Sequence, residues 1–246
     1  MGHELTANPA RRFNREVYEL FDDFDQFVTA DLWTSAVVGT GTVTRPATAA
    51  TNIRLLSTAD NDAAVLATTG ENFKFTGGKS MYAECQLTFT DPQTSLGSIA
   101  FGWADAMAAT LLADDGGAAT VINDGCIIYK IETELVWRFH TELGTLANKA
   151  GDGSSSAPTA STVSTTASGG GVSQQLSIDI TPRSSTIFEA RPFVDGVQLK
   201  DANGIPIMHA LALGTATDMD FGFVMKGFHA DDMIATSDYV YASQVR

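Results

Sequence analysis

Apolar residues alternate with polar ones along the C-terminal part of the chain, a pattern that predicts β-strands with one buried face. Asp195 and Gly196 separate two such segments, and this pair favours a tight hairpin turn because glycine adopts a positive φ without steric cost. No segment of helical periodicity intervenes, so we expect the strands to pair antiparallel. The alternating segments are residues 175–180, 191–199, 219–225 and 238–246.

The first two thirds of the chain contain further short segments that are rich in Thr and Val and are separated by Gly, Pro, Asn and Asp. With the C-terminal segments they predict an all-β fold, a two-sheet antiparallel jelly-roll sandwich. Residues 104–112 fit either a short helix or an irregular loop. The other expected strands are residues 29–33, 39–44, 53–58, 64–68, 79–89, 98–103, 125–129 and 135–140. Six rings are expected inside the sandwich: Trp33, Trp103, Trp137, Phe193, Phe221 and Phe223.

Residues 8–24 form the one segment whose apolar positions follow a helical period. Asn8 is a suitable N-cap, and Pro9 suits the first helical position. A helix of this length is marginal alone in water, so its apolar stripe must dock on another surface. We expect residues 1–27 to form a helical arm that contacts a neighbouring subunit or a larger assembly; the alternative is that the stripe caps the sandwich of a monomer. The predicted assembly interface is Phe13, Val17, Leu20, Phe21 and Phe24.

The rest of the chain, residues 28–246, is expected to be a single β-sandwich domain. Residues 151–171 are of low complexity, with Ser, Thr, Ala and Gly in nearly every position. Such a stretch buries too little apolar surface to offset its ordering entropy, so it predicts a long exposed loop inside the sandwich rather than a linker between domains.

Composition excludes several functional classes. The chain has 246 residues, of which 29 are acidic and 15 basic, and the resulting formal charge of −14 argues against binding to nucleic acid. No apolar run approaches the roughly 20 residues that span a bilayer, and the N-terminus lacks a signal-peptide pattern, so we expect a soluble protein made in a cytoplasm. Cys85 and Cys126 lie in or beside apolar runs, which favours buried thiols over a disulfide.

No catalytic site emerges from the motifs. Glycoside hydrolysis needs two carboxylates at a defined separation. Glu132 and Glu134, like Asp218 and Asp220, have the spacing that places two carboxylates on one strand face, but each pair is better explained as the solvated end of a strand. Nucleophile and phosphate-loop motifs are absent. We therefore expect a protein that is not an enzyme and that requires no cofactor.

Metal ligation is likewise not predicted. The acidic groups at residues 22–25, 60–62 and 114–116 are candidate calcium-binding sites, yet none has the regularly spaced oxygens of an EF-hand loop. The four histidines form no His-x-x-x-His pair. Acidic clusters of this kind are expected on the surface of any chain with such a negative charge.

The order of segments resembles virion structural proteins of tailed bacteriophages. The residues that carry the resemblance are Leu-Phe-Asp-Asp-Phe at 20–24, Gly-Thr-Gly-Thr at 39–42, Phe-Gly-Trp at 101–103, Phe-Val-Asp-Gly-Val at 193–197 and the terminal strand from Asp238. The body of these proteins is a concanavalin A-like (laminin G-like) jelly roll, and several are capsid decoration, or cement, proteins.

The resemblance implies a non-catalytic protein on the outer surface of a virion, whose partner is the major capsid protein. It also implies a homo-oligomer, with a trimer weakly favoured over a dimer. The alternative is a carbohydrate-binding, lectin-like module of a phage tail or surface protein, which would use exposed aromatic rings and Asp or Asn at loop tips. Fold alone does not decide between the two functions.

Overall fold

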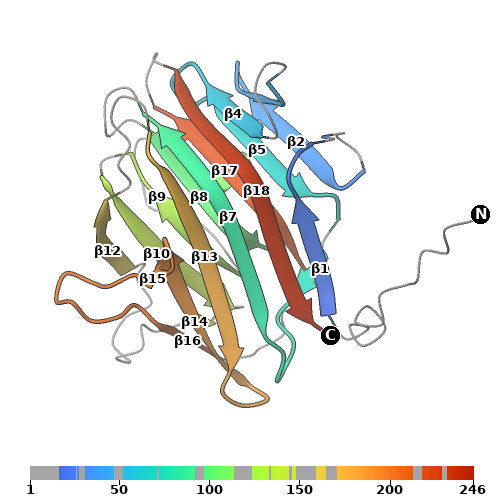
Figure 1. Ribbon diagram of the computed structural model, residues 1–246, viewed down its shortest axis with the longest axis vertical. Helices are drawn as coiled ribbons and strands as arrows, with labels where there is room; N and C mark the ends of the chain where they lie inside the picture. The colour runs from blue at the N-terminus through green and yellow to red at the C-terminus, as the bar shows by residue number, and fades with distance from the viewer. Residues whose placement is uncertain are drawn as a thin grey trace, which may run out of the picture.

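The computed structural model describes residues 17–25, 27, 31–46, 52–70, 72–91, 97–113, 124–132, 134–143, 146–147, 159–164, 171–212, 218–228 and 232–246. These residues form two stacked antiparallel sheets, with the short 3-10 turn η2 (Ala109–Leu111) as the described helical element (Figure 1). The predicted all-β sandwich is confirmed. No helix in the described part of the chain is long and apolar enough to cross a membrane.

The first sheet, sheet A, contains the first and last strands of the described chain. Its order is β15-β14-β13-β7-β18-β4-β3, with β1 added along β18 and β16 along β14. Its strands are β1 (Val17–Asp22), β3 (Thr42–Thr44), β4 (Ile53–Ser57), β7 (Met81–Thr90), β13 (Ser173–Pro182), β14 (Ile187–Val194), β15 (Val197–Gln198), β16 (His209–Ala212) and β18 (Met233–Val245).

The second sheet, sheet B, packs against the inner face of sheet A. Its order is β11-β10-β9-β8-β17-β5-β2, with β12 paired to β10 and β6 to β17. Its strands are β2 (Trp33–Val38), β5 (Ala63–Thr68), β6 (Phe73–Lys74), β8 (Gly97–Ala104), β9 (Asp124–Lys130), β10 (Val136–Leu143), β11 (Leu146–Ala147), β12 (Thr159–Ser164) and β17 (Asp218–Gly227).

The main core lies between the sheets and is rich in rings. Alternate residues of β7 are buried along its whole length, as the sequence pattern predicts. Phe221 is the central ring, with Trp33, Phe101 and Trp103 at centroid distances of 6.5, 5.5 and 5.8 Å. Five of the six rings expected inside are buried; Phe193 is the exception.

Phe193 lies half-buried on the outer face of sheet A, so its predicted burial is wrong. Phe188, Ala190 and Val194 are the residues of β14 that join the core. Side chains alternate between the two faces of a strand. Because the even-numbered residues of β14 point into the core, Phe193 points outward. The hairpin that follows is confirmed: Val194 pairs with Val197 across Asp195 and Gly196, which have φ values of 50° and 74°.

The prediction of a helix over residues 8–24 is wrong for residues 17–24, the part of this segment that the structure describes. Val17–Asp22 forms β1, which pairs antiparallel with β18 from Val17↔Val245 to Asp22↔Val240. Tyr18 and Leu20 fit the inward face of a strand, and the edge of β18 supplies hydrogen-bond partners that an isolated helix lacks. The chain then turns at Phe24, whose N–H donates to Asp22 Oδ1 at 2.7 Å.

Two smaller predictions also need correction. The strand expected at residues 29–33 instead begins at Trp33 and continues to Val38. Within the predicted loop at 151–171, residues 159–164 form β12, which pairs with the free edge of β10. In both cases cross-strand partners decide the backbone conformation more strongly than local composition does.

Candidate functional site

The outer face of sheet B carries a second apolar cluster, which is covered by residues 105–112, here named the strap. Met107, Leu111 and Leu112 of the strap are buried against outward-facing residues of the sheet. Lys226 Nζ donates to the Leu112 carbonyl at 3.4 Å, and Asp105 N–H donates to the Asp124 carbonyl at 2.8 Å. The strap thus leaves two parts of this face with polar side chains, one on each side of it.

A pocket of about 330 Å³ lies beside the strap, where β2, β5 and β17 meet. Its size falls at the lower end of the range of about 300–1,000 Å³ that is typical of ligand sites. Its lining combines hydroxyl and carboxylate groups with small apolar side chains and one thioether. The lining residues are Thr34, Ala36, Val65, Ala67, Thr68, Gly70, Met107 and Asp220.

Hydrogen bonds fix the polar rim of the pocket. Thr68 Oγ1 accepts the N–H of Phe221 at 3.1 Å, which ties β5 to β17. Thr34 Oγ1 lies 3.2 Å from the hydroxyl of Thr69, and the Thr69 N–H donates to the Leu32 carbonyl at 2.8 Å. The rim is therefore held in place before any ligand binds, which lowers the ordering cost of binding.

The strand register explains how Asp220 reaches the pocket. Met219, Phe221 and Phe223 of β17 point into the main core, so Asp220 points to the outer face. The next outward position is Gly222, opposite Gly102 of β8, and both have a positive φ. A Cβ at Gly222 would lie 2.0 Å from the Leu66 carbonyl oxygen, so the close approach of the strands requires glycine.

The other polar region lies on β10, across the strap from the pocket. Arg138 forms an ion pair with Glu134, and His140 Nε2 lies 3.6 Å from Glu142 Oε2. Burial lowers the pKa of His140, while burial and the charges of Asp105 and Asp124 raise the pKa of Glu142. Both shifts are toward the neutral form of the group, because burial disfavours the charged form.

The five residues of the predicted assembly interface do not lie on one face. Leu20 and Phe24 are buried in the main core, whereas Phe21 is 62% exposed on the outer face of sheet A. Val17 is half-buried, and Phe13 lies outside the described residues. The alternation of β1 therefore separates Leu20 from Phe21. Contact of these residues with another subunit stays a prediction.

The acidic groups weighed in the sequence have structural partners where they are described. Asp22 accepts hydrogen bonds from Phe24 N–H and from Trp33 Nε1, the latter at 2.6 Å. Asp62 accepts a hydrogen bond from Thr40, and Asp218 forms an ion pair with Lys74 at 3.2 Å. The described residues contain no group of three or more His, Cys, Asp or Glu side chains arranged to hold a metal ion. Residues 114–116 lie outside the described part.

Sequence reasoning missed the pocket because its residues come from distant segments. In the sequence, Asp218 and Asp220 have the spacing of a carboxylate pair on one strand face. In the structure their surroundings differ, because Asp218 is exposed at the strand end and Asp220 is half-buried in the pocket. The alternation of β17 already separates Asp220 from the core rings. The threonines and Met107 carry no comparable local signal.

The fold is similar to that of several lectins. The carbohydrate recognition domain of Emp47p aligns with 92% of this chain and 94% of its own length, at 12% identity and a TM-score of 0.56. The exoplasmic/lumenal domain of VIP36, in a form bound to Ca²⁺ and Man3GlcNAc, covers 94% of this chain and 90% of its own, at 12% identity and a TM-score of 0.54.

Peanut lectin aligns at 12% identity and a TM-score of 0.53, over 93% of this chain and 97% of its own. A protein of unknown function from Shewanella oneidensis MR-1, SO2946, covers 99% of this chain and 96% of its own at 9% identity and a TM-score of 0.52. The sequence itself matches no family model and no curated protein. The chain therefore has a lectin-like, concanavalin A-like β-sandwich fold.

Proposed function

We propose that the chain is a non-catalytic carbohydrate-binding module, with the glycan seated in the pocket beside the strap. The observation that carries the proposal is a pocket in which Thr34 and Asp220 line the same space as small apolar side chains, while Thr68 is held by hydrogen bonds to the backbone. The lectin-like fold supports the same class of ligand.

The chemistry of the lining suits a sugar. A carboxylate accepts hydrogen bonds from hydroxyl groups and strengthens them by its charge, while threonine hydroxyls both donate and accept. Ala36, Ala67 and Met107 offer apolar surface to the C–H groups of a pyranose ring. Asp220 and the formal charge of −14 favour a neutral glycan over an anionic one.

A glycan array followed by titration calorimetry tests the proposal. Asp220→Asn should weaken binding of the best neutral glycan about tenfold or more, because a hydrogen bond to a charged group contributes roughly 1.5–3 kcal/mol. Asp218→Asn is the matched control, since Asp218 lies two residues away on β17 and pairs with Lys74 outside the pocket. Equal affinity of the two variants, or no glycan bound at millimolar concentration, would contradict the proposal.

The resemblance to capsid decoration proteins supports a second candidate function. Phe21, one of the predicted interface residues, is 62% exposed, and an exposed ring of this kind is typical of a surface that another protein covers. In this proposal the partner is the major capsid protein, the location is the virion surface and the chain assembles as a homo-oligomer. Co-sedimentation with purified capsids that lack their decoration protein tests it, and free protein in every supernatant would contradict it.

A further inference from the structure

The outer face of sheet A is the side of the sandwich toward the viewer in Figure 1. One row of cross-strand neighbours runs over this face from β1 to β14. Phe21 pairs with Tyr241, Tyr241 with Glu84, Glu84 with Ser177, and Ser177 with Phe193. Residues directly opposite each other point to the same side of a sheet, so these five side chains form a line across five strands.

Two further tyrosines widen this line into an aromatic surface. The ring of Phe21 stacks on Tyr239 at a centroid distance of 6.3 Å, and the Tyr82 ring lies 6.0 Å from that of Tyr241. Phe21 is exposed and the three tyrosines are half-buried. We name this surface the aromatic face and define it by Phe21, Tyr82, Phe193, Tyr239 and Tyr241.

The carboxylate of Glu84 lies among these rings and accepts hydrogen bonds from two of them. Tyr82 Oη and Tyr239 Oη each donate to Glu84 at 2.5 Å, and Gln175 Nε2 donates to Tyr239 Oη at 3.1 Å. Burial, followed by Glu84, raises the pKa of Tyr82 and of Tyr239 to about 12, so both hydroxyls remain donors at neutral pH.

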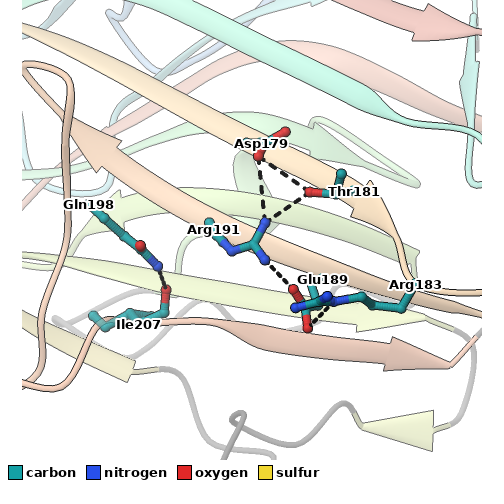
Figure 2. Close-up of polar contacts among 7 residues, drawn as sticks. All are labelled: Asp179, Thr181, Arg183, Glu189, Arg191, Gln198 and Ile207. Atoms are coloured by element: carbon teal, nitrogen blue, oxygen red, sulfur yellow. Dashed lines mark hydrogen bonds and ion pairs between the residues drawn. The ribbon is translucent and has the colours of Figure 1, made fainter.

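Two acidic groups beside the aromatic face, Asp179 and Glu189, form ion pairs with arginine. Figure 2 shows Arg191 between Asp179 and Glu189, with Arg183 on the far side of Glu189. Arg191 Nη1 lies 3.7 Å from Asp179 Oδ2 and donates to Thr181 Oγ1 at 2.9 Å, and Arg183 Nε lies 2.5 Å from Glu189 Oε1. The charges of Asp179 and Glu189 are thus offset within the same sheet, whereas Glu19 of β1 is exposed on this face two residues before Phe21.

Composition distinguishes this surface from an ordinary solvated one. The five strands that build it, β1, β18, β7, β13 and β14, contain no lysine. Lysine is depleted at protein interfaces, while tyrosine, phenylalanine and arginine are enriched. The absence of lysine from these five strands is thus typical of a surface that contacts protein.

The dimensions of the surface fit one partner in particular. Five strands spaced about 4.8 Å apart set the width of the surface, and six residues of about 3.4 Å each set its length, which together give roughly 500 Å² of flat area. Projecting side chains increase the accessible area of this surface. Each partner in a standard interface buries about 800 Å². We propose that the aromatic face binds a second copy of the chain, with the two faces packed across a two-fold axis. A second copy presents the same flat aromatic sheet, and two such sheets can pack face to face as the two layers of a sandwich do.

Light scattering of the full chain tests the proposal. The wild-type protein should have twice the chain mass of 26.0 kDa at tens of micromolar. Phe21→Glu should shift it to the single-chain mass and weaken association about 30-fold or more, because it places a charge where an exposed aromatic ring would be buried. Val37→Glu is the control, because Val37 is an exposed apolar residue of β2 in the other sheet. It should leave the dimer intact.

Salt dependence gives a second, independent measurement. Two copies with a formal charge of −14 repel each other, so the dimer should tighten when salt rises from about 0.05 M to about 0.5 M. A wild-type protein of single-chain mass at every concentration would overturn the proposal, as would an unchanged mass of the folded Phe21→Glu variant. Weakening of the dimer by salt would also overturn it. The dimer does not depend on glycan binding at the pocket, so the two proposals can fail independently of each other.

Discussion

Lys130 and Asp91 form an ion pair whose two side chains have no solvent exposure. Nζ lies 3.6 Å from Asp91 Oδ2 and donates to the Gly97 carbonyl at 2.5 Å, while the Gly97 N–H donates to the same carboxylate. Burial lowers the pKa of Lys130 to about 8, against the opposing effect of Asp91. The pair joins the end of β7 to the end of β9, and both of its groups bond to Gly97 at the start of β8.

Lys130→Met should lower the free energy of unfolding by about 3–5 kcal/mol, because it leaves a buried carboxylate without its counter-charge. The double variant Lys130→Met/Asp91→Asn should recover part of this loss, since the amide oxygen still accepts the Gly97 N–H and no charge remains. Urea unfolding at neutral pH measures both. A double variant no more stable than the single one would contradict the prediction.

His209 gives the sandwich a predictable response to acid. It is 2% exposed, and Nδ1 lies 2.8 Å from Thr141 Oγ1 of the opposite sheet. Burial, and secondly His140, lowers its pKa from 6.5 to about 4. Between these two pH values the unfolded chain binds more protons than the folded one, so stability is fully present above pH 6.5 and falls as the pH drops toward 4.

His209→Gln should therefore reduce the loss of stability between pH 7 and pH 4.5, by at most about 3 kcal/mol at 1.36 kcal/mol per pKa unit. The lowered pKa of His140 acts in the same direction and remains in the variant, so some pH dependence persists. Urea unfolding at the two pH values measures the effect. An unchanged difference between them would show that His209 does not titrate with unfolding.

At the scale of single elements, β1 is the clearest case in which the pattern in the sequence admits two structures. Apolar residues at 17, 20, 21 and 24 satisfy a helical stripe, but Tyr18 and Leu20 also satisfy the inward face of a strand that ends where Asp22 caps a turn. The choice depends on the free edge of β18, which comes from the other end of the chain. Local spacing carries no information about that edge.

Adjacent substitutions in β1 test the assignment. Leu20→Ala should lower the free energy of unfolding by about 2–5 kcal/mol, because Leu20 is 3% exposed in the main core. Phe21→Ala should change it by less than about 1 kcal/mol in the monomer, since the ring is largely in water. Chemical denaturation of both variants measures the difference. Equal losses would fit an amphipathic helix, in which Leu20 and Phe21 belong to one stripe.

At the scale of the whole molecule, one core joins both sheets. Trp33, Trp103 and Trp137 come from β2, β8 and β10, which are widely separated in sheet B, and all three belong to that core. We expect a single cooperative unfolding transition, with tryptophan fluorescence and far-ultraviolet circular dichroism changing together. Two separate transitions would instead indicate independent domains, against the single sandwich expected for residues 28–246.

The sequence by itself determined the class of fold and most of the strands of the core. Alternation along β7, β8, β13, β17 and β18 is a local property, because a side chain one position further along a strand always points to the other face. The turn at Asp195 and Gly196 was equally local, since it depends on the φ angles that two residues adopt. Burial of the three tryptophans followed from the same alternation.

Tertiary structure alone decided the rest. It placed Val17–Asp22 on the edge of β18, brought β12 to β10, and aligned Phe21 with Phe193 across five strands. It also assembled the pocket from β2, β5, β17 and the strap. Each of these features depends on which strands become neighbours, and that choice is made by the packing of distant apolar faces, which no local pattern of residues contains.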